Sequence, residues 1–108
     1  MLLGPYPINK IELYVTQSMP GVYILSRDGK TVAYVGRSDT DLRSRLQQSA
    51  REGIGYVYFW FEYTDSSKEA YLKECEYYHK YNPKDNINHP ATPFGTNWKC
   101  PIVGCPFS

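Results

Sequence analysis

The stretch GVYILSRDGKTVAYVG, residues 21–36, decides how the chain folds. Its two ends, residues 21–25 and 31–35, are rich in β-branched and aromatic side chains, which favour β-strands. Between them lies the segment RDGK, residues 27–30, and an Asp-Gly pair between two such runs is a strong local signal for a hairpin turn. The sequence therefore predicts an antiparallel hairpin at the start of the folded core.

A helix is predicted directly after the hairpin. Residues 38–41, SDTD, offer several N-cap side chains, and Leu42, Leu46 and Ala50 then recur four residues apart, which marks one face of a helix. Gly53 ends this helix. The next segment, residues 56–61 (YVYFWF), is so short and so aromatic that it predicts a covered third strand.

A second helix is predicted from Ser66, because Glu69 follows three residues later, at the spacing of a capping box. The helix ends near Asn82, since Pro83 disfavours helical backbone in the residue before it. The order strand, strand, helix, strand, helix indicates an α+β fold with a small antiparallel three-stranded sheet flanked by helices.

The length of 108 residues is that of one domain. We expect a single domain over residues 1–108, with its core at about 20–90, an N-terminal arm at 1–15 and an irregular, cysteine-containing tail at 91–108. Hydrophobic residues make up 42% and charged residues 21%, which excludes a disordered chain. The sequence contains no apolar run of roughly 18 residues and no signal peptide, so we expect a cytoplasmic protein without a membrane partner.

The formal net charge of +1 does not by itself indicate a nucleic-acid partner. A local basic patch is nevertheless available from four arginines, Arg37, Arg43, Arg45 and Arg51. Because such a patch neutralises few phosphates, any binding of DNA should be weak and steeply dependent on salt.

Two tripeptides of the hairpin resemble the paired signatures of the GIY-YIG nuclease superfamily. They are Gly-Val-Tyr at 21–23 and Tyr-Val-Gly at 34–36, with valine in both isoleucine positions. The resemblance covers about residues 21–88. It implies the GIY-YIG fold and a metal-dependent endonuclease activity.

The first helix is similar to the superfamily pattern Asp-Leu-x-x-Arg-Leu at residues 41–46. Arg45 therefore takes the place of the catalytic arginine. The segment after Gly36 is one residue longer than the pattern, which leaves Arg43 as an alternative. The register with Leu42 and Leu46 favours Arg45.

The second helix resembles the acidic helix of the superfamily. An alanine, a glutamate four residues later and a proline nine beyond the glutamate occur here as Ala70, Glu74 and Pro83. Glu74 thus resembles the metal-binding glutamate, in preference to Glu69 or Glu76.

An asparagine commonly follows that proline by three residues, and Asn86 stands at this position. Asn88, which follows an apolar residue, is the alternative.

The resemblance implies a role for each of these residues in phosphodiester hydrolysis. Glu74 would hold Mg²⁺ or Mn²⁺, since Mg²⁺ takes only one or two protein carboxylates and keeps several waters. Arg45 would bind the phosphate with its planar fork, Tyr34 would position it, and Asn86 would orient a neighbour or the substrate. Tyr23 is the candidate general base, although a tyrosine with a pKa of about 10 is a poor base at neutral pH.

Two functions remain open from the sequence. The first is an endonuclease acting on DNA, branched or single-stranded, whose specificity comes from its own loops, from its tyrosine-rich surface or from a protein partner. The second is a module that keeps the fold and binds nucleic acid or protein without cutting.

Cysteines in the tail raise the separate question of a zinc site. Cys100 and Cys105 have four residues between them, and His89 would add a third ligand, while Cys75 and His79 stand elsewhere in the sequence. Zinc ligands usually occur as two short pairs, and no second pair is near in sequence. We therefore expect reduced thiols in the tail, with a disulfide or zinc as alternatives, and predict that it binds no zinc.

Overall fold

A computed structural model describes residues 1–107, which form a four-stranded antiparallel sheet, three α-helices and one 3-10 turn. The elements in chain order are β1 (Leu3–Pro7), η1 (Ile8–Lys10), α1 (Ile11–Tyr14), β2 (Gly21–Ser26), β3 (Tyr34–Ser38), α2 (Leu42–Glu52), β4 (Tyr58–Tyr63) and α3 (Ser67–Tyr81). The predicted α+β class is confirmed.

The strand order in the sheet is β1-β4-β2-β3, so β2 lies in the interior and β3 at one edge. Tyr23 of β2 pairs with Gly36 of β3 on one side and with Phe61 of β4 on the other. The predicted hairpin is therefore present, but its second strand runs over 34–38 instead of 31–35. The shift has a local cause: the Asp28 carboxylate accepts hydrogen bonds from the backbone N–H groups of residues 30 and 31, which holds them in the turn.

The N-terminal arm contributes a strand that the sequence did not predict. β1 pairs with β4 at three positions, and two prolines lie in or at the end of this short strand. Proline has no backbone N–H and is tolerated at a sheet edge, where one side of the strand has no neighbour. The prediction of a three-stranded sheet was thus one strand short.

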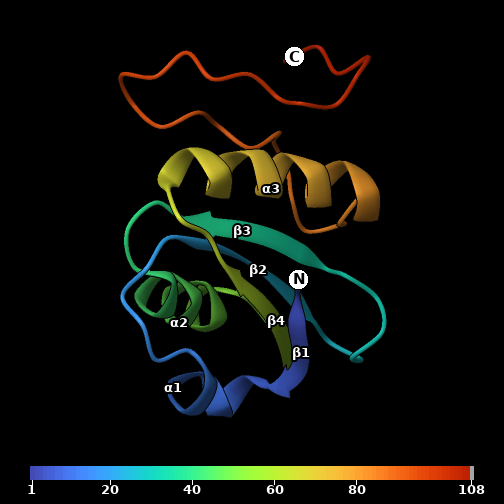
Figure 1. Cartoon of the computed structure of the whole chain (residues 1–108). Helices are drawn as coiled ribbons and strands as arrows, with labels where there is room; N and C mark the ends of the chain where they lie inside the picture. The colour runs from blue at the N-terminus through green and yellow to red at the C-terminus, as the bar shows by residue number, and fades with distance from the viewer. Residues whose placement is uncertain (108) are drawn as a thin grey trace.

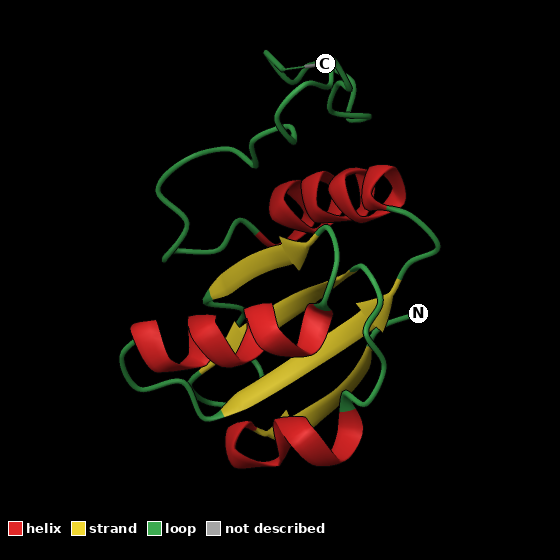
Figure 2. Ribbon diagram, turned by 90° about the vertical axis from the view of Figure 1, so that its left-hand side faces the viewer, coloured by secondary structure: helices red, strands yellow, loops and turns green. Residues whose placement is uncertain are grey.

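Helices cover both faces of the sheet (Figure 1; Figure 2). On one face, α1 and α2 close a core of buried side chains: Ile11, Val15, Tyr23, Leu25, Leu42, Leu46, Phe59 and Phe61. On the other face, α3 covers a smaller cluster: Val22, Ile24, Val35 and Tyr77. Alternate residues of β2 thus serve two cores, as expected for a strand that is buried on both faces.

The ends of both long helices follow the predicted caps. The Asp41 carboxylate accepts from the Ser44 N–H at the start of α2, and the Ser66 hydroxyl accepts from the Glu69 N–H at the start of α3. Asn82 takes a left-handed conformation at the end of α3, directly before the proline.

Residues 82–107 contain no helix or strand. The segment first follows the edge of β3, where Asn86 pairs with Val35, and its later part runs across the outer side of α3 (Figure 1). Within residues 1–107, no helix has the length and apolar character needed to cross a membrane.

Candidate active site

A polar pocket of about 460 Å³ lies at the free edge of β3 and is bounded by α2, α3 and the start of the tail. Four of the five residues singled out from the sequence line it together: Tyr34, Arg45, Glu74 and Asn86. Asn88, the alternative asparagine, lines it as well. Residues 40 positions apart in sequence thus meet because the strand and both helices converge on one edge of the sheet.

Glu74 projects from α3 and is only 7% exposed. Its Oε1 accepts a hydrogen bond from Arg37 Nη1 at 2.5 Å, and Arg37 also reaches the Asp39 carboxylate, 3.0 Å from Nε. Burial raises the pKa of the Glu74 carboxyl above its ordinary value, and the guanidinium of Arg37 opposes this shift. The ion pair therefore helps to keep a buried carboxylate charged.

Arg37 was assigned from the sequence to a local basic patch for phosphates, but in the structure its charge is already paired. Its side chain is 12% exposed and paired with two carboxylates. The signal was present in the strand alternation, since Arg37 and Val35 share the face of β3 that α3 covers, and Glu74 lies on α3.

Arg45 and Tyr34 form the side of the pocket nearest α2. Arg45 is exposed and its Nη1 donates to the Gln48 side chain at 3.3 Å, which leaves most of the guanidinium open to the pocket. Tyr34 is half-buried. Burial raises the pKa of its hydroxyl, and the charge of Arg45 opposes the rise.

Tyr23 lies in the core and not in the pocket wall. It is completely buried, its hydroxyl is hydrogen-bonded to the Ser49 hydroxyl of α2, and its ring lies against Gly36. Burial also raises the pKa of this hydroxyl far above its ordinary value, so the phenolate that a general base requires is strongly disfavoured. The ring centroids of Tyr23 and Tyr34 are 6.2 Å apart, so Tyr23 supports the tyrosine that faces the pocket.

The two asparagines differ in how they are held. The Asn86 side chain accepts from the Val35 N–H at 2.9 Å and donates to the Val35 carbonyl at 3.0 Å, so its amide is used to fix the chain against the edge of β3. Asn88 is exposed at the wall of the pocket. By position, Asn86 is an anchor and Asn88 is accessible to a ligand.

The donor atoms of the pocket fit a hard divalent cation. The carboxylates of Glu74 and Asp39, the hydroxyls of Ser38 and Thr40, and an asparagine amide all offer oxygen, which Mg²⁺ prefers to nitrogen or sulfur.

Comparison with known proteins places these features in one superfamily. No family model matches the chain. UvrABC system protein C of Clostridium tetani is 31% identical over 87 residues, and that of Geotalea daltonii is 37% identical over 82 residues. These matches cover 70% and 66% of this chain but only 14% and 13% of the relatives, so the chain spans about one seventh of their length.

Solved structures match over nearly their whole length. The GIY-YIG N-terminal endonuclease domain of UvrC from Thermotoga maritima, bound to magnesium as its catalytic divalent cation, superimposes with a TM-score of 0.62 and 26% identity. The match covers 74% of this chain and 96% of that domain. A tyrosine-to-phenylalanine variant of the same domain gives a TM-score of 0.63 at 26% identity, over 75% of this chain and 96% of that one. The likeness supports a nuclease role in general, and with the paired hairpin signatures it shows that the chain belongs to the GIY-YIG nuclease superfamily.

Proposed function

We propose that this chain is a metal-dependent endonuclease that hydrolyses phosphodiester bonds in DNA. The observation that carries the proposal is the pocket at the edge of β3, in which Tyr34, Arg45 and Glu74 line one polar space. Phosphodiester hydrolysis with a divalent cation needs an activated water and positive charge at the phosphate, and a phenol, a guanidinium and a buried carboxylate can serve these needs.

Glu74 is the proposed ligand of Mg²⁺ or Mn²⁺. When bound there, the cation would offset negative charge at the scissile phosphate and make the attacking water more acidic. Burial raises the pKa of the Glu74 carboxyl, and the guanidinium of Arg37 opposes this rise and so favours the charged form that a cation would bind.

Arg45 and Tyr34 are the proposed contacts to the phosphate. The exposed guanidinium of Arg45 can bind two phosphate oxygens at once and stabilise the charge that develops on them. The hydroxyl of Tyr34 can donate to a phosphate oxygen. To accept a proton from water it would first have to lose its own, which burial opposes and the charge of Arg45 favours. Tyr23 then acts as a positioning residue, through its ring contact with Tyr34.

A second pocket indicates where a nucleic-acid strand could lie across the site. This pocket of about 710 Å³ is also lined by Tyr34 and Arg45, and it extends over Tyr56 and Lys84 on the other side of these two residues. A nucleic-acid strand lying across both pockets would place one phosphate at Arg45. We include in this proposal that the substrate is branched or single-stranded DNA. A protein partner could determine which of the two is cut.

The alternative function is a module that binds without cutting. It is favoured by the Arg37–Glu74 ion pair, because a cation must compete with Arg37 for the carboxylate. The two functions differ in one assay, in which the protein is incubated with supercoiled plasmid and with a branched oligonucleotide duplex.

Under the endonuclease proposal, nicking appears with Mg²⁺ or Mn²⁺ and stops when EDTA is added. Binding without nicking in either metal, measured by gel shift on the same substrates, would establish the module instead.

A further inference from the structure

We propose that His79, His89, Cys100 and Cys105 form a structural zinc site that fastens the tail to α3. One ligand atom from each of these four side chains lies within 4.8 Å of every other. Two imidazoles and two thiols make a set of four that zinc binds tetrahedrally in structural sites. This reverses the expectation from the sequence, where only three candidate ligands could be brought together.

The distances fit such a site. With zinc–sulfur bonds of about 2.3 Å and zinc–nitrogen bonds of about 2.0–2.1 Å, neighbouring ligand atoms of a tetrahedron lie roughly 3.3–3.8 Å apart. Cys105 Sγ and His89 Nε2 are 3.3 Å apart. The widest pair has to close by about 1 Å, which a small rotation of a side chain achieves.

The hydrogen bonds around the four candidate ligands resemble those that orient the ligands of a bound metal. His89 Nδ1 lies 2.9 Å from the Pro90 carbonyl oxygen, which can accept only if Nδ1 carries the hydrogen. The lone pair is then on Nε2, which faces the cysteine sulfur. A histidine ligand commonly donates its other N–H to a backbone carbonyl in this way. The backbone N–H of Phe107 points to Cys105 Sγ at 3.4 Å, and its ring stacks on His89 with centroids 4.3 Å apart.

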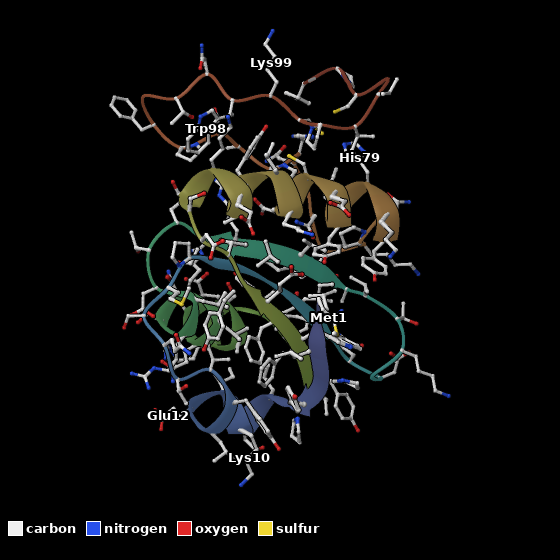
Figure 3. All side chains as sticks on the ribbon, in the orientation of Figure 1. Met1, Lys10, Glu12, His79, Trp98 and Lys99 are labelled. Carbon is white, nitrogen blue, oxygen red and sulfur yellow. The ribbon has the colours of Figure 1, made fainter. Side chains whose placement is uncertain are left out.

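The ligands come from three places in the fold. His79 belongs to the last turns of α3 and lies on the side of the helix that faces the tail (Figure 3). His89 stands where the chain leaves the sheet edge, and Cys100 and Cys105 are the buried ends of a turn in which Gly104 has a φ of +88°. A metal here would join the helix to both ends of the tail.

Beyond the hydrogen bonds of Asp85 and Asn86, the tail has little to hold it. Residues 91–107 form no helix or strand, and the cluster that packs them on α3 has four buried members, of which Cys100 and Cys105 are two. An irregular segment of this length in a small domain needs an additional constraint. Phe94 and Val103, by contrast, are almost fully exposed.

The site is distinct from the proposed catalytic metal. Its ligand set contains no carboxylate and leaves no open position, as in structural zinc sites. It nevertheless touches the candidate active site, because His89 and the neighbouring Asn88 and Pro90 line the same pocket as Glu74. A zinc ion would therefore fix one wall of that pocket.

The test is the metal content of the full chain, purified without added metal and freed of any histidine tag. We expect about one zinc per chain by inductively coupled plasma mass spectrometry. After zinc is exchanged for Co²⁺, we expect the visible absorption bands of tetrahedral cobalt with thiolate ligands. Cys105→Ser and His79→Ala should each lose the metal. Cys75→Ala is the matched control, since Cys75 packs in the same cluster but is outside the ligand set, and it should keep the metal.

Wild-type protein that contains no zinc, and that takes up neither Zn²⁺ nor Co²⁺ on refolding, would overturn the proposal. So would a Cys100–Cys105 disulfide detected by mass in the unreduced protein, or zinc retained in Cys105→Ser. None of these outcomes depends on nuclease activity, and Glu74→Gln, which should lose cleavage, should keep its zinc.

Discussion

Gly36 of β3 lies under the ring of Tyr23 on the neighbouring strand, so close that a Cβ on Gly36 would stand 2.4 Å from both the Cζ atom and the hydroxyl oxygen of Tyr23. The glycine that ends the Tyr-Val-Gly signature is thus required by the tyrosine that ends the Gly-Val-Tyr signature. We expect Gly36→Ala to destabilise the fold by about 1–3 kcal/mol, because the buried ring has no space to move into. Urea denaturation measures this free energy of unfolding. In a Tyr23→Leu background, which removes the colliding atoms, the same substitution should cost clearly less; an equal cost in both backgrounds would contradict the explanation.

The two signature tyrosines should respond differently to loss of the hydroxyl. Tyr34→Phe removes a group that lines the pocket, and we expect a fall in cleavage rate of roughly a hundredfold with little change in stability. Tyr23→Phe leaves the buried Ser49 hydroxyl without its partner, and we expect a loss of about 1–3 kcal/mol in stability with a smaller effect on rate. Single-turnover cleavage and urea denaturation of both variants separate the two effects. The reverse pattern would make Tyr23 the catalytic tyrosine.

Glu74→Gln should reduce metal-dependent cleavage by roughly a thousandfold or more, since an amide keeps the shape but loses the charge that a hard dication requires. The thermal midpoint should change little, because the amide oxygen can still accept from Arg37. Glu76→Gln is the control: it lies on the same helix but is exposed, and its activity should stay within a few fold of wild type. If both variants cut at the wild-type rate, the proposed metal ligand is wrong.

Asp85 connects three segments near the candidate active site and gives a pH-dependent prediction. Its carboxylate accepts from Arg27 at 2.8 Å and from the Tyr56 hydroxyl at 2.5 Å, and these hydrogen bonds, led by that of Arg27, hold the pKa of Asp85 below its usual value. A lowered pKa contributes stability that is present above the unfolded value of 3.8 and is lost as the pH falls through the folded value.

Asp85→Asn should therefore lower the thermal midpoint at pH 7, and the difference from wild type should shrink as the pH falls below about 4. Thermal melts across this range measure it. Asp65→Asn, at an exposed position between β4 and α3, is the matched control and should show a smaller difference. A difference for Asp85→Asn that stays constant down to pH 2 would mean that the charge is not what stabilises the contact.

Much of the fold could be predicted because its signals are local. The Asp28–Gly29 turn, the Ser66 cap and the four-residue spacing of Leu42 and Leu46 each depend on neighbours in the chain, and each appears in the structure. The strand β1 has no such signal, since its pairing with β4 joins residues more than 50 positions apart. An edge strand with prolines does not show the alternation that identifies a strand.

The resemblance pointed to residues that line the pocket but not to their contacts. Arg45, Glu74 and Asn86 took their assignments from the superfamily patterns, and all three line the pocket, whereas Tyr23 does not. The burial of Tyr23, the pairing of Arg37 with Glu74 and the approach of His79 to the tail depend on how two layers pack, which spacing along the chain does not specify.

The pairing of Asn86 with both backbone groups of Val35 has a consequence for association between molecules. β3 ends the sheet on that side, and an uncovered strand edge is a template onto which a second chain can add by backbone hydrogen bonds. The Asn86 amide pairs with the N–H and C=O of Val35, and the Asp85 N–H donates to the carbonyl of Ala33, so these backbone groups of the edge are already used within the molecule. We therefore expect Asn86 to disfavour edge-to-edge association, because its removal would expose the N–H and C=O of Val35 to a second chain.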